Sequence, residues 1–289
     1  MEKTLKKEAF PGFLAELREK GQVLGPTRRG GGTSTYSQAI FGPINRIEEL
    51  QLGYRSLMVS PRKILFPDHQ SLYEYAVAGD DILLGDAQET WDEDRIFLGL
   101  HPCDIAAVNR LDQLFLKDRY VDPYYQNRRD HSLIIGLTCS QPQDHCFCNV
   151  VGTGPDCDSG CDLLLTDLGD RYYLRVLSDR GRRLLAGGAF EDAGAEDKKR
   201  REEALERVAR ALPPKLDLDR VAAAMRDKFG DALWDEFSDA CVSCGACNMV
   251  CPTCHCFTIL DKSNPDRSRG RRVLVWDACH FERFAQMAG

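Results

Sequence analysis

The chain has 289 residues, of which 43% are apolar, so it is long and apolar enough for two domains with buried cores. Its net charge of -7 gives no electrostatic reason to expect a nucleic-acid ligand. No stretch reaches the roughly 18 to 20 apolar residues that a membrane-spanning helix requires.

Thirteen cysteines are present in a sequence without secretory features. Residues 1–17 begin with charged side chains and lack the apolar core and the small-residue cleavage site of a signal peptide. We therefore expect a cytoplasmic protein whose thiols are reduced or bound to metal. The odd number of cysteines and their clustering fit a set of metal ligands better than a disulfide framework.

Residues 1–178 are predicted to form an α/β domain that includes a cluster site. Four short apolar runs are typical of buried strands, namely SLMVS at 56–60, ILFP at 64–67, IFLGL at 96–100 and LIIGL at 133–137. The third run leads through Cys103 into an amphipathic helix, and the fourth is followed by Cys139. The ends of strands in an α/β sheet are where working residues usually lie.

We expect Cys103, Cys139, Cys146 and Cys148 to hold one cluster, because four thiols on neighbouring strand ends can bind one. The alternative is that Cys103 and Cys139 are small buried residues, as free cysteines commonly are. Cys146 and Cys148 favour the cluster, since two cysteines one residue apart on a polar loop are poor core residues.

Residues 179–238 are predicted to be a charged linker followed by helices. The charge-dense segment 180–215 is interpreted as a linker and a solvated helix that ends before Pro213 and Pro214. A second helix is expected from about Asp217 to Phe237, because apolar residues recur four apart along one face. These residues are Val221, Met225, Phe229, Leu233 and Phe237. The remaining segment, 239–289, is too short for a large core, so we expect metal to organise it.

The segment 241–256 contains six cysteines. Cys241, Cys244, Cys247 and Cys251 follow the spacing C-x2-C-x2-C-x3-C-P, which is the ligand run of bacterial ferredoxins. Gly245 suits the tight loop of such a run, because glycine adopts dihedral angles closed to other residues. We predict that the first three thiolates bind one 4Fe-4S cluster. Zinc is the alternative, since C-x2-C pairs also bind zinc, but the full spacing favours iron.

The fourth ligand of this cluster is left open by the sequence. In two-cluster ferredoxins the last cysteine of the run serves the other cluster, and no second run occurs before Gly289. If the chain continues, as we expect, Cys251 serves the second cluster, and Cys254, Cys256 and Cys279 are supports or extra ligands. Otherwise a nearby thiol completes the first site. Cys279 is then the candidate, because VLVW at 273–276 can return as a strand beside the cluster loop.

The stretch CVSCGACNMVCPTCHCF and the later VWDAC resemble a family of iron-sulfur electron-transfer subunits, those of anaerobic sulfite reductase and of cytoplasmic sulfhydrogenase, where it is the beta subunit. The resemblance also covers HPCDIAAVNRLDQLFL, DPYYQNRR and residues 139–174, and so spans most of residues 95–289. Members of this family usually continue into a second C-x2-C-x2-C-x3-C-P run. The whole sequence therefore predicts an α/β N-terminal domain, a helical linker and a small ferredoxin-like iron-sulfur domain at 239–289.

The resemblance implies a part in an anaerobic, cytoplasmic, multi-subunit oxidoreductase. Such a chain relays single electrons between two partners, a flavin-containing subunit on one side, with a catalytic reductase or hydrogenase subunit on the other. It has at least one 4Fe-4S cluster and no catalytic residues of its own. Two other classes of protein are weighed against it. One is a zinc-stabilised binding or assembly module without a redox role, and the other is a self-contained reductase with its own flavin site, for which no convincing phosphate loop is present.

Overall fold

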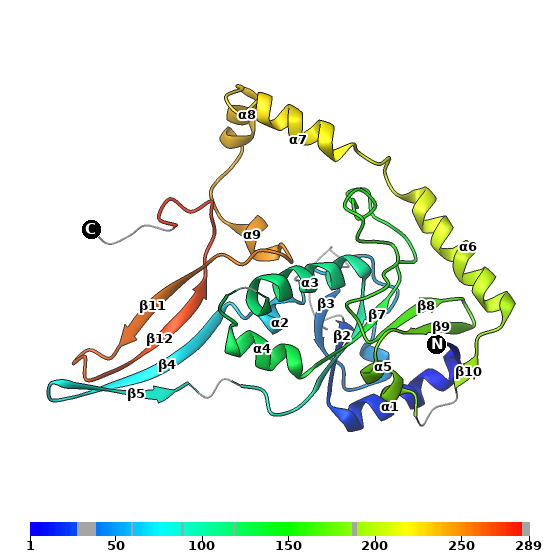
Figure 1. The fold of residues 1–289 in the computed structure, drawn as a ribbon, viewed down its shortest axis with the longest axis horizontal. Helices are drawn as coiled ribbons and strands as arrows, with labels where there is room; N and C mark the ends of the chain where they lie inside the picture. The colour runs from blue at the N-terminus through cyan, green and yellow to red at the C-terminus, as the bar shows by residue number, and fades with distance from the viewer. Residues whose placement is uncertain (28–38, 59, 88–89, 118, 187–189, 285–289) are drawn as a thin grey trace.

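The computed structural model describes residues 1–27, 39–58, 60–87, 90–117, 119–186 and 190–284, and two β-sheets form its framework (Figure 1). The larger sheet has eight strands in the order β10-β1-β9-β8-β7-β6-β2-β3, and the smaller has four in the order β11-β12-β4-β5. The larger sheet consists of β1 (Glu2–Lys6), β2 (Gln22–Thr27), β3 (Ile40–Pro43), β6 (Arg95–Leu100), β7 (Ser132–Leu137), β8 (Leu163–Asp167), β9 (Arg171–Val176) and β10 (Phe190–Asp192).

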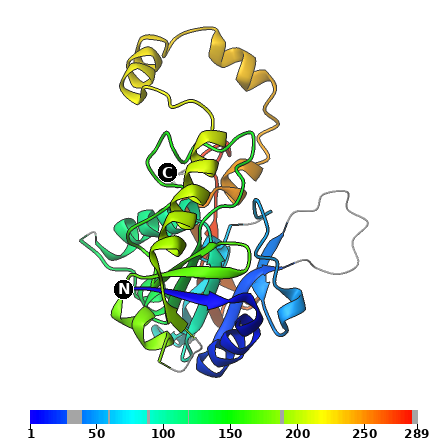
Figure 2. The ribbon, with the colours of Figure 1, turned by 90° about the vertical axis from the view of Figure 1, so that its right-hand side faces the viewer.

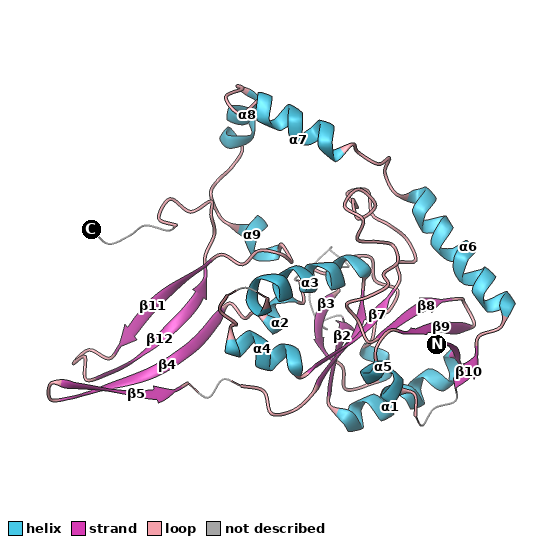
Figure 3. Ribbon diagram, in the orientation of Figure 1, coloured by secondary structure: helices cyan, strands magenta, loops and turns pink. Residues whose placement is uncertain are grey.

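The helices are short apart from three, and most of them cover the larger sheet (Figure 3). They are α1 (Phe10–Lys20), α2 (Arg62–Leu65), α3 (Pro102–Leu116), α4 (Pro123–Asp130), α5 (Asp179–Leu184), α6 (Ala195–Ala211), α7 (Leu218–Asp227), α8 (Leu233–Asp239) and α9 (Ala246–Val250), with single 3-10 turns at Lys7–Ala9 and Ile47–Glu49. The described part of the chain thus has the mixed α/β content that the sequence predicts.

The larger sheet separates two apolar cores. Its strands β2, β6, β7 and β8 run parallel, and their side chains alternate between the two faces. Ile96 and Leu98 of β6 pack with α1 and α5, whereas Phe97 packs with α3 and α4. The alternation shifts at Gly99, whose φ of +89° accompanies an irregular register, so that Leu100 joins the α3 side.

The strands expected at 96–100 and 133–137 are confirmed as β6 and β7, which lie side by side, and the helix after Cys103 is confirmed as α3. The other two expected strands are wrong. Residues 62–65 form α2, and within 56–60 only Leu57 makes an isolated bridge, while residue 59 lies outside the described residues. A short apolar run cannot by itself distinguish a buried strand from a buried helical turn. Leu65 is buried under the larger sheet as part of such a turn.

Residues 179–238 form more regular structure than a linker. α5 contributes Leu184 to one core, and β10 pairs with β1 at the edge of the larger sheet. The solvated helix is present as α6 and ends before Pro213. The single helix expected from Asp217 to Phe237 is wrong, because the chain forms α7 and α8 with a break that contains Gly230, a poor helix former. Figure 2 shows both helices away from the sheets, and their apolar side chains remain exposed.

The smaller sheet joins distant parts of the chain. It contains β4 (His69–Ala78), β5 (Asp81–Asp86), β11 (Phe257–Ser263) and β12 (Arg269–Trp276). β12 pairs with β11 on one side and with β4 on the other, both antiparallel. Val273 and Leu274 of β12 are buried, and Leu274 belongs to the core under α3. The C-terminal segment is therefore held by a sheet as well as by its cysteines.

Among the described helices, none combines the length and the apolar character that crossing a bilayer requires.

Gly136 of β7 provides a test of the central packing. A Cβ atom at this position would lie 2.7 Å from Ile105 of α3 and 2.8 Å from Leu164 of β8. We expect Gly136→Ala to lower the free energy of unfolding by ~1–3 kcal/mol, because added volume in a filled core forces neighbours to move. Chemical denaturation measures this. The matched control is Gly85→Ala in β5, where no atom lies within 4 Å and the change should be small. Equal stabilities of the two variants would contradict this packing.

Candidate metal centres

Cys103 and Cys139 follow neighbouring parallel strands, as expected. Cys103 lies in the first turn of α3 after β6, and Cys139 lies two residues after β7. The loop that follows β7 returns Cys146 and Cys148 to the same place. The Cys103 thiol interacts electrostatically with those of Cys139 and Cys148, and the Cys139 thiol also interacts with that of Cys146. The structure thus brings together the four cysteines that the sequence groups.

The surrounding backbone supports this group. The Gln143 backbone N–H donates to Cys146 Sγ at 3.2 Å. Gly154 passes so close to Cys148 that a Cβ atom would lie 3.0 Å from its sulfur. The Tyr54 ring stacks on His101 with centroids 4.1 Å apart, and its hydroxyl donates to a strand-end carbonyl at 2.8 Å. These contacts fix the strand ends that present the thiols.

The electrostatics of this first group favour neutral thiols. Burial raises the pKa of Cys139 to about 12, and neighbouring thiols act in the same direction. Cys103 reaches the surface, yet partial desolvation also raises the pKa of its thiol, as it does for Cys148. Metal binding at these cysteines must therefore displace protons, so we expect the uptake of a cluster here to depend on pH.

Cys157 and Cys161 form a thiol pair that the sequence did not lead us to expect. Their sulfurs lie 4.0 Å apart, and Cys161 is buried. The hydrogen bond from Cys161 lowers the pKa of the Cys157 thiol. Arg175 donates to the Cys157 carbonyl at 3.4 Å. The spacing C-x3-C in a glycine-containing loop is the one sequence signal that could have pointed to this pair.

The ferredoxin run forms an exposed loop and a short helix. Cys241 and Cys244 precede α9, Cys247 lies within it, and Cys251 follows its last residue. Gly245 has a left-handed φ of +67°, and the backbone N–H two residues after Cys241 donates to its sulfur at 3.4 Å. A loop that turns around a cluster and directs N–H groups at its sulfurs is typical of iron-sulfur sites. The residues present therefore fit a 4Fe-4S cluster.

Cys254, Cys256 and Cys279 lie together beside α9. The Asn248 side-chain amide is 3.6 Å from Cys254 Sγ and 3.4 Å from Cys279 Sγ. The backbone N–H of Asp277 donates to the Cys256 carbonyl at 3.0 Å. The prediction that VLVW returns as a strand beside the cluster loop is confirmed by β12. Whether these thiols are ligands stays a prediction.

Arg62 contacts this last group, although no sequence pattern marks it. It belongs to α2, is only 3% exposed, and stacks over the Trp276 ring at 3.7 Å. Its guanidinium donates to the carbonyls of Cys254 and Met249, the latter at 3.1 Å. Burial alone would raise the pKa of Cys254, but hydrogen bonds from the Cys256 backbone, the Asn248 amide and Arg62 lower it below its ordinary value.

Known proteins share this arrangement of cysteines in sequence. Residues 240–289 match the family described as a 4Fe-4S dicluster domain. The chain is also 32% identical over 287 residues to sulfhydrogenase 2 subunit beta of Pyrococcus furiosus, a match that covers 99% of this chain and 81% of that protein. The chain belongs to the sulfhydrogenase beta subunit family. No solved structure matches it.

Membership of the sulfhydrogenase beta subunit family confirms 4Fe-4S clusters as the cofactors, two of them in the C-terminal domain, and supports electron transport in an oxidoreductase. The zinc alternative is set aside by the same match. In the described part of the chain, no three His, Cys, Asp or Glu side chains form a group suited to one metal ion. The thiolates of a 4Fe-4S cluster instead bind four separate irons.

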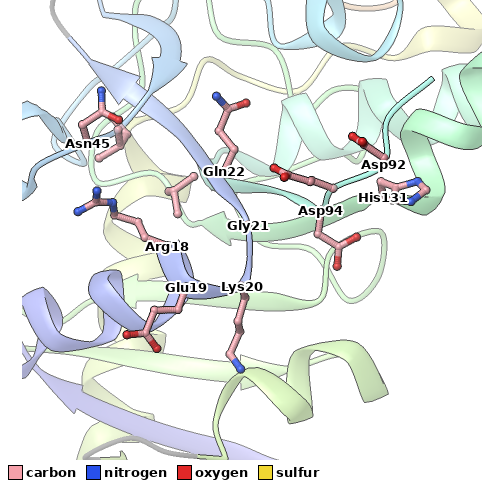
Figure 4. Close-up of a pocket in the computed structure, with 12 residues that line it drawn as sticks. Arg18, Glu19, Lys20, Gly21, Gln22, Asn45, Asp92, Asp94 and His131 are labelled. Atoms are coloured by element: carbon pink, nitrogen blue, oxygen red, sulfur yellow. The ribbon is translucent and has the colours of Figure 1, made fainter. Parts of the chain in front are cut away.

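A hollow of about 620 Å³ lies away from the cysteines (Figure 4). It is found at the amino ends of β2, β6 and β7, whereas Cys103 and Cys139 follow the carboxyl ends of β6 and β7. Its walls carry both signs of charge and include Arg18, Lys20, Asp92, Asp94 and His131. No cysteine lines it, so it belongs to neither thiol group.

Gly245 provides a test of the ferredoxin loop. A Cβ atom there would lie 2.6 Å from the Phe281 ring and 3.1 Å from Ala278, and the left-handed backbone alone costs a larger residue ~1–2 kcal/mol. We expect Gly245→Ala to release iron faster to a ferrous chelator under anaerobic conditions. The control is Gly230→Ala, where the added Cβ meets nothing within 4 Å. Equal rates of release from both variants would show that the loop does not require this glycine.

Proposed function

We propose that the protein is a non-catalytic iron-sulfur subunit that relays single electrons in the cytoplasm. Electrons pass between a partner that contains flavin and a catalytic module of hydrogenase or sulfite reductase type. The hydrogenase assignment is supported by the similarity to a sulfhydrogenase beta subunit. The sulfite reductase alternative rests on the resemblance of the cysteine segments to the iron-sulfur electron-transfer chain of that enzyme.

One observation carries this proposal, namely that a single short segment contacts both thiol groups. Tyr54 stacks on His101, two residues before Cys103. Eight residues later, Arg62 donates to the carbonyl of Cys254. The two groups of cysteines therefore lie on either side of residues 54–62, as successive stations of a relay require. Their spacing is set by packed backbone and not by a free linker.

The proposed ligands follow the two groups. Cys241, Cys244 and Cys247 hold one cluster in the ferredoxin run, which Cys251 completes in spacing. Cys103, Cys139, Cys146 and Cys148 hold another in the first domain. When bound, such clusters accept and release one electron at a time, and hydrogen bonds, charge and solvent exposure set their potentials. The chain itself positions the thiols, supplies N–H groups to their sulfurs and limits the access of water.

Substitution of one cysteine in each group tests the ligand assignment. We expect Cys139→Ala and Cys244→Ala each to remove roughly four irons per chain, because each breaks a different site of four thiolates. Iron and acid-labile sulfide are measured on the anaerobically purified full chain. Electron paramagnetic resonance of the reduced protein should lose a different signal in each variant. Unchanged iron in Cys139→Ala would mean that the first-domain cysteines are ordinary half-buried residues.

The relay itself is tested by counting electrons. Anaerobic titration with dithionite should deliver one electron per cluster, and oxidised benzyl viologen should recover them. The isolated chain should neither consume hydrogen nor reduce sulfite, because it has clusters without a substrate-converting centre. Analysis of released cofactors serves as the control for a bound flavin. Turnover of either substrate by the isolated chain, or stoichiometric flavin, would contradict the proposed relay.

A further inference from the structure

The β11–β12 hairpin closes a second cysteine group beside the ferredoxin run. Cys254 and Cys256 directly precede β11, and Cys279 follows β12 after two residues. The ladder begins with the residue after Cys256, and the Asp277 N–H donates to the Cys256 carbonyl at 3.0 Å. Residues that are distant in sequence are thus fixed side by side by backbone pairing, independently of any metal.

The three sulfurs converge as well as the backbone. The Asn248 amide nitrogen lies within 3.6 Å of both Cys254 Sγ and Cys279 Sγ. The Cys256 thiol contacts the Cys254 thiol and accepts from the backbone N–H of Cys279. Cys251 lies three residues before Cys254, and its sulfur faces the same guanidinium as Cys254 and Cys256. A complete set of four thiols therefore surrounds this place.

The buried charge of Arg62 indicates what these thiols bind. Burying a guanidinium is costly unless negative charge faces it, and the Nε of Arg62 has no hydrogen-bond partner among the described residues. The groups that face it are the sulfurs of Cys251, Cys254 and Cys256. Free thiols are neutral near pH 7, whereas thiolates bound to a cluster are negative. Cluster ligation supplies the charge that Arg62 lacks.

We propose that Cys251, Cys254, Cys256 and Cys279 bind one 4Fe-4S cluster, with the Arg62 guanidinium beside it. This deepens the proposed relay, on which it rests, because it gives the second cluster of the dicluster domain its own ligands. In a ferredoxin run the last cysteine serves a different cluster from the first three, which agrees with the place of Cys251. The segment 240–289 contains seven cysteines, which divide into the three of the run and these four.

Alanine variants of the full chain test the ligand set. We expect Cys256→Ala and Cys279→Ala each to lose roughly four irons, and the double variant to lose no more than either alone. Both should lose the same paramagnetic signal, while the signal that Cys244→Ala removes should persist. Cys157→Ala, which changes a thiol outside all three groups, is the matched control and should keep all iron.

Arg62→Gln tests the site with every thiol in place, so it does not depend on variants that fail to fold. Loss of the positive charge should shift the midpoint potential of this one cluster to a more negative value, because the guanidinium favours the more negative reduced state. The other signals should keep their potentials. Arg62→Lys should restore part of the shift.

Two results would overturn the proposal. One is full retention of iron and of all signals in Cys256→Ala and Cys279→Ala, and the other is an unshifted potential of every cluster in Arg62→Gln. Zinc in place of iron at these thiols would overturn it too. These results differ from failure of the relay, in which the unmodified chain would lack clusters or would turn over substrate by itself.

Discussion

The pairing of β12 with β4 is the constraint on which the rest of the structure depends. It joins residues 69–78 to residues 269–276, across almost 200 positions of chain. Without it, α2 and the cysteines that flank the β11–β12 hairpin would have no fixed relation. With it, Trp276 lies under Arg62, and Arg62 reaches the backbone of Cys254. A long-range ladder of this kind costs much loop-closure entropy, which burial of Val273 and Leu274 helps to offset.

The two cysteine environments differ in how they treat negative charge. Around Cys139, burial and neighbouring thiols raise the pKa, so the protein opposes ionisation until a metal provides positive charge. Around Cys254, hydrogen bonds from Asn248 and Arg62 offset the cost of burial and lower the pKa. Since potentials of iron-sulfur clusters respond to the same charges and hydrogen bonds, one chain can hold clusters of different potential.

The sequence predicted the features that depend on local pattern. The buried runs 96–100 and 133–137 identified neighbouring strands, so Cys103 and Cys139 could be expected to meet at the edge of a sheet. The spacing of Cys241, Cys244 and Cys247 identified the ferredoxin run. Both inferences need only a few consecutive residues and the known geometry of strands and cluster loops.

What the sequence could not predict depends on contacts between distant residues. Arg62 stands 192 residues before Cys254, in a segment whose apolar run suggested a strand, and no local signal marks it as a neighbour of cysteines. The partner of β12 was equally hidden, because nothing in the order of the residues selects β4 from the other candidate strands. The thiol pair of Cys157 and Cys161 was overlooked for a different reason, namely that its spacing matches no familiar cluster run.

The pairing of β12 also changes how metal and fold are related in the C-terminal segment. The sequence suggested that metal largely organises 239–289, yet β11 and β12 have a ladder and a buried face of their own. The loop with Cys241 and Cys244 is different, because its cysteines are exposed and α9 has no buried residue. Binding energy of a cluster is therefore needed most for this loop, whereas the sheet holds Cys256 and Cys279 in place beforehand. The hairpin acts as a preformed wall against which the loop is ordered when its thiolates bind metal.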